Sequence, residues 1–166
     1  MLSKTALLAT RALIVIAKDP SGRVLSPRYI ALRLNESPAY LAKVLRLLVR
    51  AGILRAQRGV TGGVFLGRPT EEITLLHIVE ACQGMIHGAY CQRLDESESV
   101  CAFHQASVEL EHAIVGVLGR WTLADLEKRP QPLGALPRGV QCRMAASPAS
   151  IKAQPVARRS PGDTTQ

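Results

Sequence analysis

Two serine–proline steps, Ser26-Pro27 and Ser37-Pro38, stand eleven residues apart in this chain. Serine is a favoured helix N-cap and proline is favoured at the first helical position, so each step predicts the start of a helix. The first helix is expected over residues 27 to about 34. The second is expected over residues 38 to about 51, where Gly52 is a good left-handed terminator. A short helix, a tight turn and a longer helix make a helix-turn-helix motif.

The segment that follows predicts a β-hairpin. Residues 53–67 place short apolar runs on either side of Gly59 and Gly62-Gly63. Because glycine adopts positive φ at low cost, these glycines are expected to form the hairpin turn. A hairpin directly after a helix-turn-helix is a wing, and Arg55 and Arg58 place positive charge on it. A phosphate-cradling nucleotide loop is disfavoured, since no Lys-Ser/Thr pair follows the glycines.

The charge distribution separates the chain into unlike parts. Residues 1–70 contain twelve Lys/Arg and two acidic residues, whereas residues 71–129 contain four Lys/Arg and ten acidic residues. Surfaces that bind phosphate backbones are rich in Lys and Arg, so the first half is expected to bind nucleic acid. The chain is not predicted to be an enzyme, because no nucleophile–base pairing, nucleotide loop or paired carboxylates stand out in it.

The N-terminal residues predict an amphipathic helix rather than a signal peptide. Apolar residues recur at helical spacing over residues 2–16, and three basic residues recur every seven positions on another, outward face: Lys4, Arg11 and Lys18. No small-residue cleavage site follows, and no stretch is long enough to span a membrane. The chain is therefore expected to be cytoplasmic, where structural disulfides are rare and cysteines serve metal or redox chemistry.

A further helix is predicted over residues 72–82, ending before Gly84, and a longer one from residue 102 to about 121. A helix of about 19 residues is about 28 Å long, which exceeds what the preceding compact domain requires. Its apolar stripe predicts a dimerisation helix. The alternative is that the stripe packs on its own domain. Dimer pairing and packing on the own domain can also occur along different parts of the helix.

Several segments of this chain match one known family in order and spacing. They are S-P-A-Y-L-A-K-V-L-R-L-L-V-R-A-G-I-L (37–54), R-G-V-T-G-G-V-F-L (58–66), I-T-L-L-H-I-V-E-A-C-Q-G (73–84) and C-A-F-H (101–104) with T-L-A-D-L (122–126). Over residues 1–129 the sequence resembles the Rrf family of bacterial winged helix-turn-helix transcription regulators, the group containing IscR, NsrR and RirA. The resemblance implies a homodimer that binds double-stranded DNA.

The expected fold is mainly α, with a two-stranded β wing and a long C-terminal dimerisation helix. Residues 1–84 are expected to form the winged helix-turn-helix DNA-binding domain, and residues 85–129 a cysteine-containing sensor loop and the dimerisation helix. Residues 130–166 contain six of the ten prolines together with Ala, Ser, Arg and Gln. That composition predicts a disordered basic tail.

Six residues are the predicted DNA contacts on a palindromic operator. The first turns of the second motif helix are expected near base edges and phosphates: Ser37, Tyr40 and Lys43. Two later residues are expected at phosphates or at the free surface: Arg46 and Arg50. From the wing, Arg58 is expected near a phosphate or in the minor groove. For Tyr40, packing inside the protein is an equal alternative.

In many members of the resembled family, three cysteines, sometimes with a histidine or an acidic residue, hold an iron–sulfur cluster in the loop. Here Cys91 matches the first cysteine and Cys101-x-x-His104 matches the last cysteine with its histidine, but residues 92–100 contain no middle cysteine. A cluster needs four ligand positions. The predicted metal ligands are Cys91, Cys101 and His104 on a 2Fe-2S or 4Fe-4S cluster. The fourth is left open between Asp95, Glu96, Glu98, Cys82 and the other subunit.

The expected function is a repressor that senses iron, nitric oxide or redox state through a cluster in the 91–104 loop. The alternative is a cluster-free regulator of the same fold, controlled by a thiol switch or a partner protein. A reversible Cys91–Cys101 disulfide would serve as such a switch. Zinc held by two cysteines, a histidine and a carboxylate is also open. Cys82 continues an apolar helix face and is predicted to be a buried structural cysteine.

Overall fold

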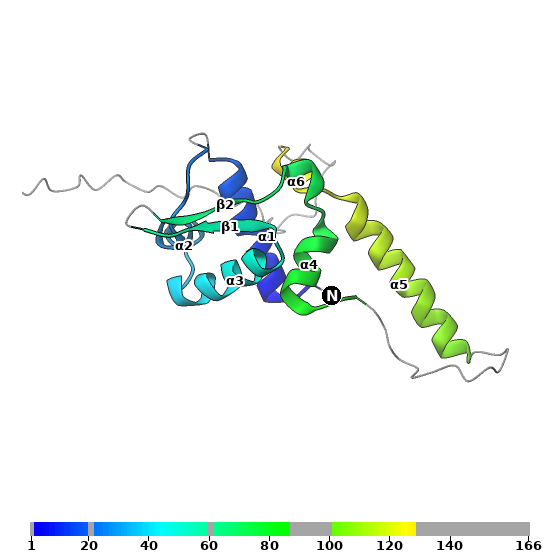
Figure 1. Ribbon diagram of the computed structural model, residues 1–166. Coiled ribbons are helices and arrows are strands. Elements are labelled where there is room, and N and C mark those ends of the chain that lie inside the picture. The colour runs from blue at the N-terminus through cyan, green and yellow to red at the C-terminus, as the bar shows by residue number, and fades with distance from the viewer. Residues whose placement is uncertain (1, 20–21, 60–61, 87–100, 129–166) are drawn as a thin grey trace, which may run out of the picture.

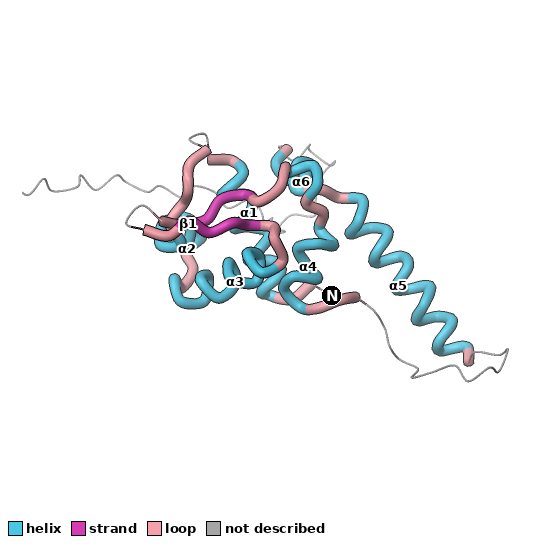
Figure 2. Tube along the Cα trace, viewed as in Figure 1, coloured by secondary structure: helices cyan, strands magenta, loops and turns pink. Residues whose placement is uncertain are grey.

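The computed structural model of this chain describes residues 2–19, 22–59, 62–86 and 101–128. In chain order its elements are α1 (Lys4–Ala17), α2 (Pro27–Leu34), α3 (Pro38–Arg50), β1 (Leu54–Gln57), β2 (Gly63–Leu66), the 3-10 helix η1 (Thr70–Glu72), α4 (Leu75–Gln83), α5 (Ala102–Arg120) and α6 (Leu123–Glu127) (Figure 1). The described chain is mainly helical with one two-stranded sheet (Figure 2). Cys91 and the predicted tail lie outside the described residues.

Helices α2 and α3 begin at the two serine–proline steps, as predicted. The Ser26 side chain accepts a hydrogen bond from the backbone N–H of Tyr29 at 3.2 Å, and α2 ends at Asn35 in the left-handed conformation, with φ 53°. Ser37 takes the N-cap position of α3, yet its side chain makes no capping hydrogen bond in the described structure. The predicted position of the second N-cap is therefore confirmed, but its side-chain hydrogen bond is not formed. The Ser37 side chain is exposed.

The core forms around one face of α3. Its four buried side chains, each at most 2% exposed, are Leu41, Val44, Leu45 and Leu48. These positions follow the i, i+3, i+4, i+7 spacing of one helix face. They belong to the same buried cluster as side chains of α1, α2 and α4, and α3 contacts all three of these helices. Because this face is covered, the opposite face of α3 must point to solvent.

The wing is an antiparallel pair in which Leu54 lies opposite Leu66 and Gln57 opposite Gly63. Gly59 has the positive φ predicted for the turn, at 115°, but Gly62 and Gly63 do not. Gly63 is needed for space, since a Cβ there would collide with the backbone carbonyl of Leu25. Leu25 pairs with Val64 through two 2.9 Å backbone hydrogen bonds and so joins the segment before α2 to the wing.

Helix α4 starts later than predicted, at Leu75. The Thr74 side chain accepts a hydrogen bond from the His77 backbone N–H, and His77 Nδ1 accepts one from the Thr74 backbone N–H, both at 3.2 Å. This reciprocal cap sets the first turn of α4. Thr74 also bridges to Thr122: Leu75 N–H donates to the Trp121 carbonyl and Leu123 N–H to the Ile73 carbonyl, at 2.8 and 2.7 Å.

Helix α5 extends away from the rest of the described chain along most of its length (Figure 1). It contacts α4, but none of its residues is buried. Three large apolar side chains are exposed on it: Phe103, Leu110 and Val117. Beside it lies an apolar groove of about 460 Å³ between α4, α5 and the start of the chain. The groove is lined mainly by Leu2, Val79, Ile86, Ile114, Val117 and Leu118.

Among the described residues, no helix is both long enough and apolar enough to cross a membrane.

Replacing Leu123, which is fully buried at the start of α6, by alanine is expected to lower the free energy of unfolding by about 2–5 kcal/mol. The reason is that neighbouring side chains fill such a cavity incompletely. Chemical denaturation at fixed protein concentration measures the change. Leu32→Ala truncates a leucine that is 69% exposed on α2 and should change stability by less than about 0.5 kcal/mol. If Leu123→Ala lowered the free energy of unfolding as little as Leu32→Ala does, the packing of Leu123 in the core would be contradicted.

Candidate nucleic-acid interface and cysteine site

The outward face of α3 carries a continuous basic stripe. Lys43, Arg46 and Arg50 are all exposed. Their spacing of three and four residues places them above one another on one side of the helix, opposite the buried leucines and valine. The sequence of α3 contains no acidic residue that would neutralise the stripe. The structure therefore brings these three predicted DNA contacts together on one free surface.

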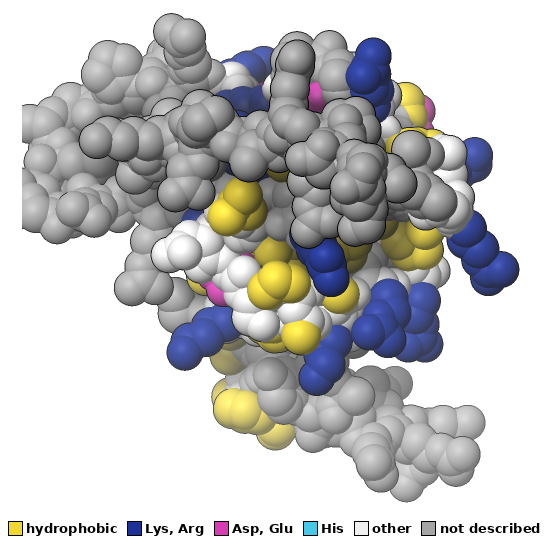
Figure 3. Space-filling model, turned by 90° about the vertical axis from the view of Figure 1, so that its left-hand side faces the viewer, with side chains coloured by type: hydrophobic (Ala, Val, Ile, Leu, Met, Phe, Trp, Pro, Cys, Tyr) yellow, Lys and Arg dark blue, Asp and Glu magenta, His cyan; other side chains and the backbone are white. Residues whose placement is uncertain are grey.

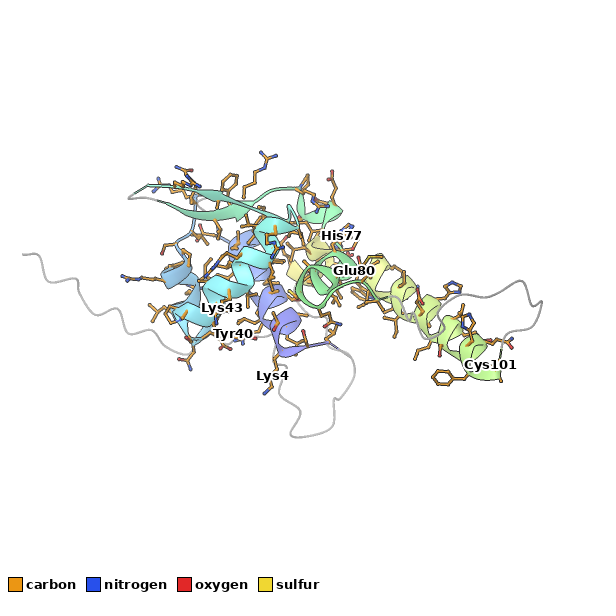
Figure 4. The ribbon with its side chains drawn as sticks, turned by 60° about the horizontal axis from the view of Figure 1, so that its bottom comes forward. Lys4, Tyr40, Lys43, His77, Glu80 and Cys101 are labelled. Atoms are coloured by element: carbon orange, nitrogen blue, oxygen red, sulfur yellow. The ribbon has the colours of Figure 1, made fainter. Side chains whose placement is uncertain are left out.

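Tyr40 is neither fully packed inside the protein nor fully free for a DNA contact, the two alternatives predicted for it. Its side chain is 38% exposed, and its hydroxyl shares a 3.0 Å hydrogen bond with the Thr5 hydroxyl of α1. Figure 4 shows Tyr40 and Lys43 on α3, with Lys4 on the neighbouring end of α1. A hydroxyl that is bonded once retains capacity for one more hydrogen bond. Tyr40 thus links α3 to α1 and still reaches the surface near Ser37.

Other basic side chains surround this stripe. Arg58 is exposed beside the turn of the wing, and Arg55 is exposed on β1. Sequence reasoning missed two exposed arginines of α2, Arg28 and Arg33, of which Arg33 lies 5.9 Å from the centroid of the Tyr29 ring. Helical spacing could have indicated their exposure, because both lie away from the apolar face of α2 that is buried. Figure 3 shows Lys and Arg side chains spread around this end of the molecule, with little acidic surface in view.

Two arginines of the basic half do not extend freely into solvent. Arg11 was expected on an outward face of the first helix, but it is partly buried. It donates to the Leu34 carbonyl at 3.3 Å and lies 3.5 Å from the Glu36 carboxylate. Arg68, which follows the wing, donates to the backbone carbonyls of Ala51 and Gly52. These side chains bind the protein itself at either end of α3.

Cys101 occupies the N-cap position of α5. Its sulfur accepts a hydrogen bond from the backbone N–H of His104 at 3.4 Å, so the two predicted ligands share the first turn of the helix. The thiol is exposed, and Figure 4 shows it at the far end of α5 from the winged domain. Exposure suits either iron binding or reaction with an oxidant.

The donor set at this position is incomplete in the described part of the chain. Cys91 falls outside the described residues, which contain no group of three His, Cys, Asp or Glu side chains that could hold a metal ion. Cys82 is half-buried on α4, and burial raises the pKa of its thiol to about 11. At neutral pH it is therefore a protonated thiol, which suits the predicted structural role better than that of a ligand.

A helix-turn-helix followed by a two-stranded wing, with a basic face on the second helix of the motif, defines a winged-helix DNA-binding regulator. More particularly, the chain belongs to the Rrf2 family. The model of that family, described as an iron-dependent transcriptional regulator, matches residues 2–129. This match confirms the resemblance inferred from the sequence motifs and, with the fold described above, the predicted fold class.

The relatives of this chain are transcriptional regulators by name. It is 34% identical over 107 residues to YwgB of Bacillus subtilis strain 168, an HTH-type regulator; the match covers 62% of this chain and 69% of YwgB. The structure of CymR, the global cysteine regulator of B. subtilis, superposes with a TM-score of 0.63 at 26% identity. The oxidized form of Staphylococcus aureus CymR superposes with a TM-score of 0.62 at 28% identity. Each superposition covers 79% of this chain and 98% of the other.

Proposed function

We propose that this regulator binds a palindromic operator in double-stranded DNA as a homodimer and represses transcription there. The observation that carries the proposal is the exposed stripe of Lys43, Arg46 and Arg50 on the second helix of the motif. A two-fold dimer would insert its two α3 helices into successive major grooves, about 34 Å apart. The site is thus the surface made by α3 and the wing.

Within this interface the six predicted contacts take different roles. Ser37, Tyr40 and Lys43 stand in the first turns of α3, the part of a recognition helix that reaches base edges. Ser37 suits this role because its exposed hydroxyl is not used for capping. Arg46 and Arg50 are assigned to phosphates, and Arg58 on the wing to a phosphate or the adjacent minor groove.

Replacing Lys43 by alanine is expected to weaken operator binding about tenfold without unfolding the protein, since the side chain is exposed and its charge is lost from the DNA face. The test is a titration of a fluorescent duplex selected from random-sequence DNA by the wild-type protein. Lys128→Ala removes the same charge from the C-cap of α6 and serves as the control. Unchanged affinity of Lys43→Ala would remove Lys43 from the interface.

Homodimerisation is assigned to α5 and the groove beside it. A helix of 19 residues with no buried side chain derives little stability from its own chain, because helices of this kind depend on tertiary packing. The groove and the exposed Leu110 and Val117 form an apolar surface next to α4. A second copy of α5 presents the same apolar stripe, so a two-fold pairing would cover both.

Val117→Lys is expected to shift the protein from dimer to monomer, because Val117 is 47% exposed and lines the groove. A charge there would be buried without a partner in the proposed dimer. Sedimentation velocity measures the change of mass at micromolar concentration. Leu32→Lys introduces the same side chain on α2 and should leave the dimer intact. A Val117→Lys protein that stays dimeric would move the interface elsewhere.

For the sensor, we infer that Cys91, Cys101 and His104 hold an iron–sulfur cluster of the 2Fe-2S or 4Fe-4S type, through which the protein senses iron, nitric oxide or redox state. The iron-dependent description of the family and the shared helical turn of Cys101 and His104 support this assignment. A bound cluster supplies a redox-active iron centre. The chain itself contributes an exposed thiol and an imidazole at the start of α5.

A second candidate is a cluster-free regulator, controlled by a reversible Cys91–Cys101 disulfide or by a partner protein. The similarity to the oxidized form of S. aureus CymR favours it, as does the lack of a third cysteine between Cys91 and Cys101 in the sequence. The exposed Cys101 thiol is accessible to an oxidant. The Cys82 thiol is expected to react more slowly, because it is half-buried and burial raises its pKa.

A visible absorption spectrum of protein purified without oxygen separates the two candidates. Thiolate-to-iron bands are expected in the wild type and should be lost in Cys101→Ala, because one ligand is removed. Cys82→Ala is the matched control and should keep the bands. A protein that stays colourless and free of iron after reconstitution with iron and sulfide would exclude the cluster. Thiol counting before and after mild oxidation would then test the disulfide.

A further inference from the structure

Two arginines from outside the helix-turn-helix bind the chain segments that flank α3, one before its start and one after its end. We propose that Arg11 and Arg68 are positioning residues: they set the orientation of α3 on DNA, and do not bind DNA themselves. By charge alone both would count among the twelve basic residues of the DNA-binding half. The proposal rests on the function proposed above, in which α3 is the helix that reads the operator.

At the N-terminal end, Arg11 of α1 spans the turn between α2 and α3. Its Nη2 donates to the carbonyl of Leu34, the last residue of α2, and its Nη1 lies 3.5 Å from Glu36 Oε1. Glu36 immediately precedes the N-cap residue of α3. The two side chains are only 23% and 33% exposed, so their attraction is partly shielded from water.

Glu36 is itself informative, because residues 1–70 contain only one other acidic residue, Asp19. An acid beside a DNA-binding helix weakens the attraction to phosphate. Its presence in the turn therefore calls for a different role, and its contact with Arg11 supplies one. The pair joins α1 to the turn that enters α3, and it neutralises an arginine whose side chain is only partly exposed.

At the C-terminal end, Arg68 binds the carbonyls of the α3 C-cap residue, Ala51, and of the next residue, Gly52. Its Nη2 donates to the Ala51 carbonyl at 3.0 Å and its Nε to the Gly52 carbonyl at 3.3 Å. Carbonyls at a helix C-terminus lack intrahelical partners and carry partial negative charge, so a cation is favoured there. The neighbouring Gly67 N–H donates to the Ile53 carbonyl at 2.9 Å. Arg68 thereby ties the end of the wing to the end of α3.

Loss of a positioning residue and loss of a phosphate contact have different effects on DNA binding. A phosphate contact releases counterions, so its loss lowers the slope of log affinity against log salt by about 1 and weakens binding to every sequence alike. A positioning residue leaves that slope unchanged and lowers the preference for the operator over random DNA, because base contacts depend on the placement of α3.

Glu36→Gln is the decisive variant, because the two explanations differ in the operator-to-random affinity ratio. If the charge alone matters, its loss should tighten binding to operator and random DNA alike and leave the ratio unchanged. If the Arg11–Glu36 pair positions α3, the ratio should fall about fivefold, as for the loss of one hydrogen-bonded contact. Both affinities are measured by titration at several salt concentrations, below the temperature at which any variant begins to unfold.

Arg11→Lys and Arg68→Lys complete the test, since lysine keeps the charge but cannot bridge two acceptors as a planar guanidinium does. Each is expected to lower the same ratio about fivefold with no change of salt slope. Arg58→Gln is the comparison for a phosphate contact and should lower the slope by about 1. An unchanged ratio in the folded lysine variants and in Glu36→Gln would overturn the proposal. If Lys43→Ala and Arg58→Gln also had no effect, the assignment of α3 and the wing to DNA would fail instead.

Discussion

The burial of one face of α3 is the constraint on which the proposed DNA-binding surface depends. Leu41, Val44, Leu45 and Leu48 are at most 2% exposed, and each buried aliphatic side chain of this size contributes about 1.5–3 kcal/mol. A helix turns 100° per residue, so burying this face forces Lys43, Arg46 and Arg50 onto the opposite one. The interaction that stabilises the domain is therefore also the one that presents the basic stripe.

A second constraint joins the long helix to this domain. The bridge between Thr74 and Thr122 is made by backbone hydrogen bonds of 2.7 and 2.8 Å, and Leu123 follows it directly into the core. Backbone bonding of this kind holds the C-terminal end of α5 at a defined place beside α4. The opposite end carries Cys101, and no residue of α5 is buried there. Helix α5 is thus anchored at one end only within the described chain.

Much of the fold could be predicted because its signals are local. The start of α2 follows from Ser26-Pro27. The end of α3 shortly before Gly52 follows from a glycine that tolerates the left-handed conformation, here with φ 69°. The start of α4 was placed too early. Its cap pairs Thr74 with a histidine, whereas the familiar cap signature has Glu or Gln at that position.

The contacts that organise the site were not predictable from the sequence alone. Arg11 shares a seven-residue spacing with the exposed Lys4 and Lys18, and nothing local distinguishes it from them. Its partners lie 23 and 25 residues further along the chain, and those of Arg68 lie 16 and 17 residues back. Periodicity shows which side of a helix is apolar, but it does not show what meets the polar side. The basic stripe of α3 could be found from spacing, whereas the arginines that hold its ends could not.

The position of Cys101 limits how the signal proposed for the cysteine site would reach DNA. Cys101 and Trp121 cap opposite ends of α5, a helix of 19 residues that is about 28 Å long. A chemical change at Cys101 is therefore remote from α3 of the same subunit. In the proposed dimer, however, α5 lies in the interface, where a change at its free end would alter how the two subunits pair. Because the two α3 helices must match successive major grooves, a small rotation of one subunit against the other changes the fit to the operator. With Arg11 and Arg68 positioning α3 as proposed, the helix would move with its subunit as one body and carry that rotation to the operator.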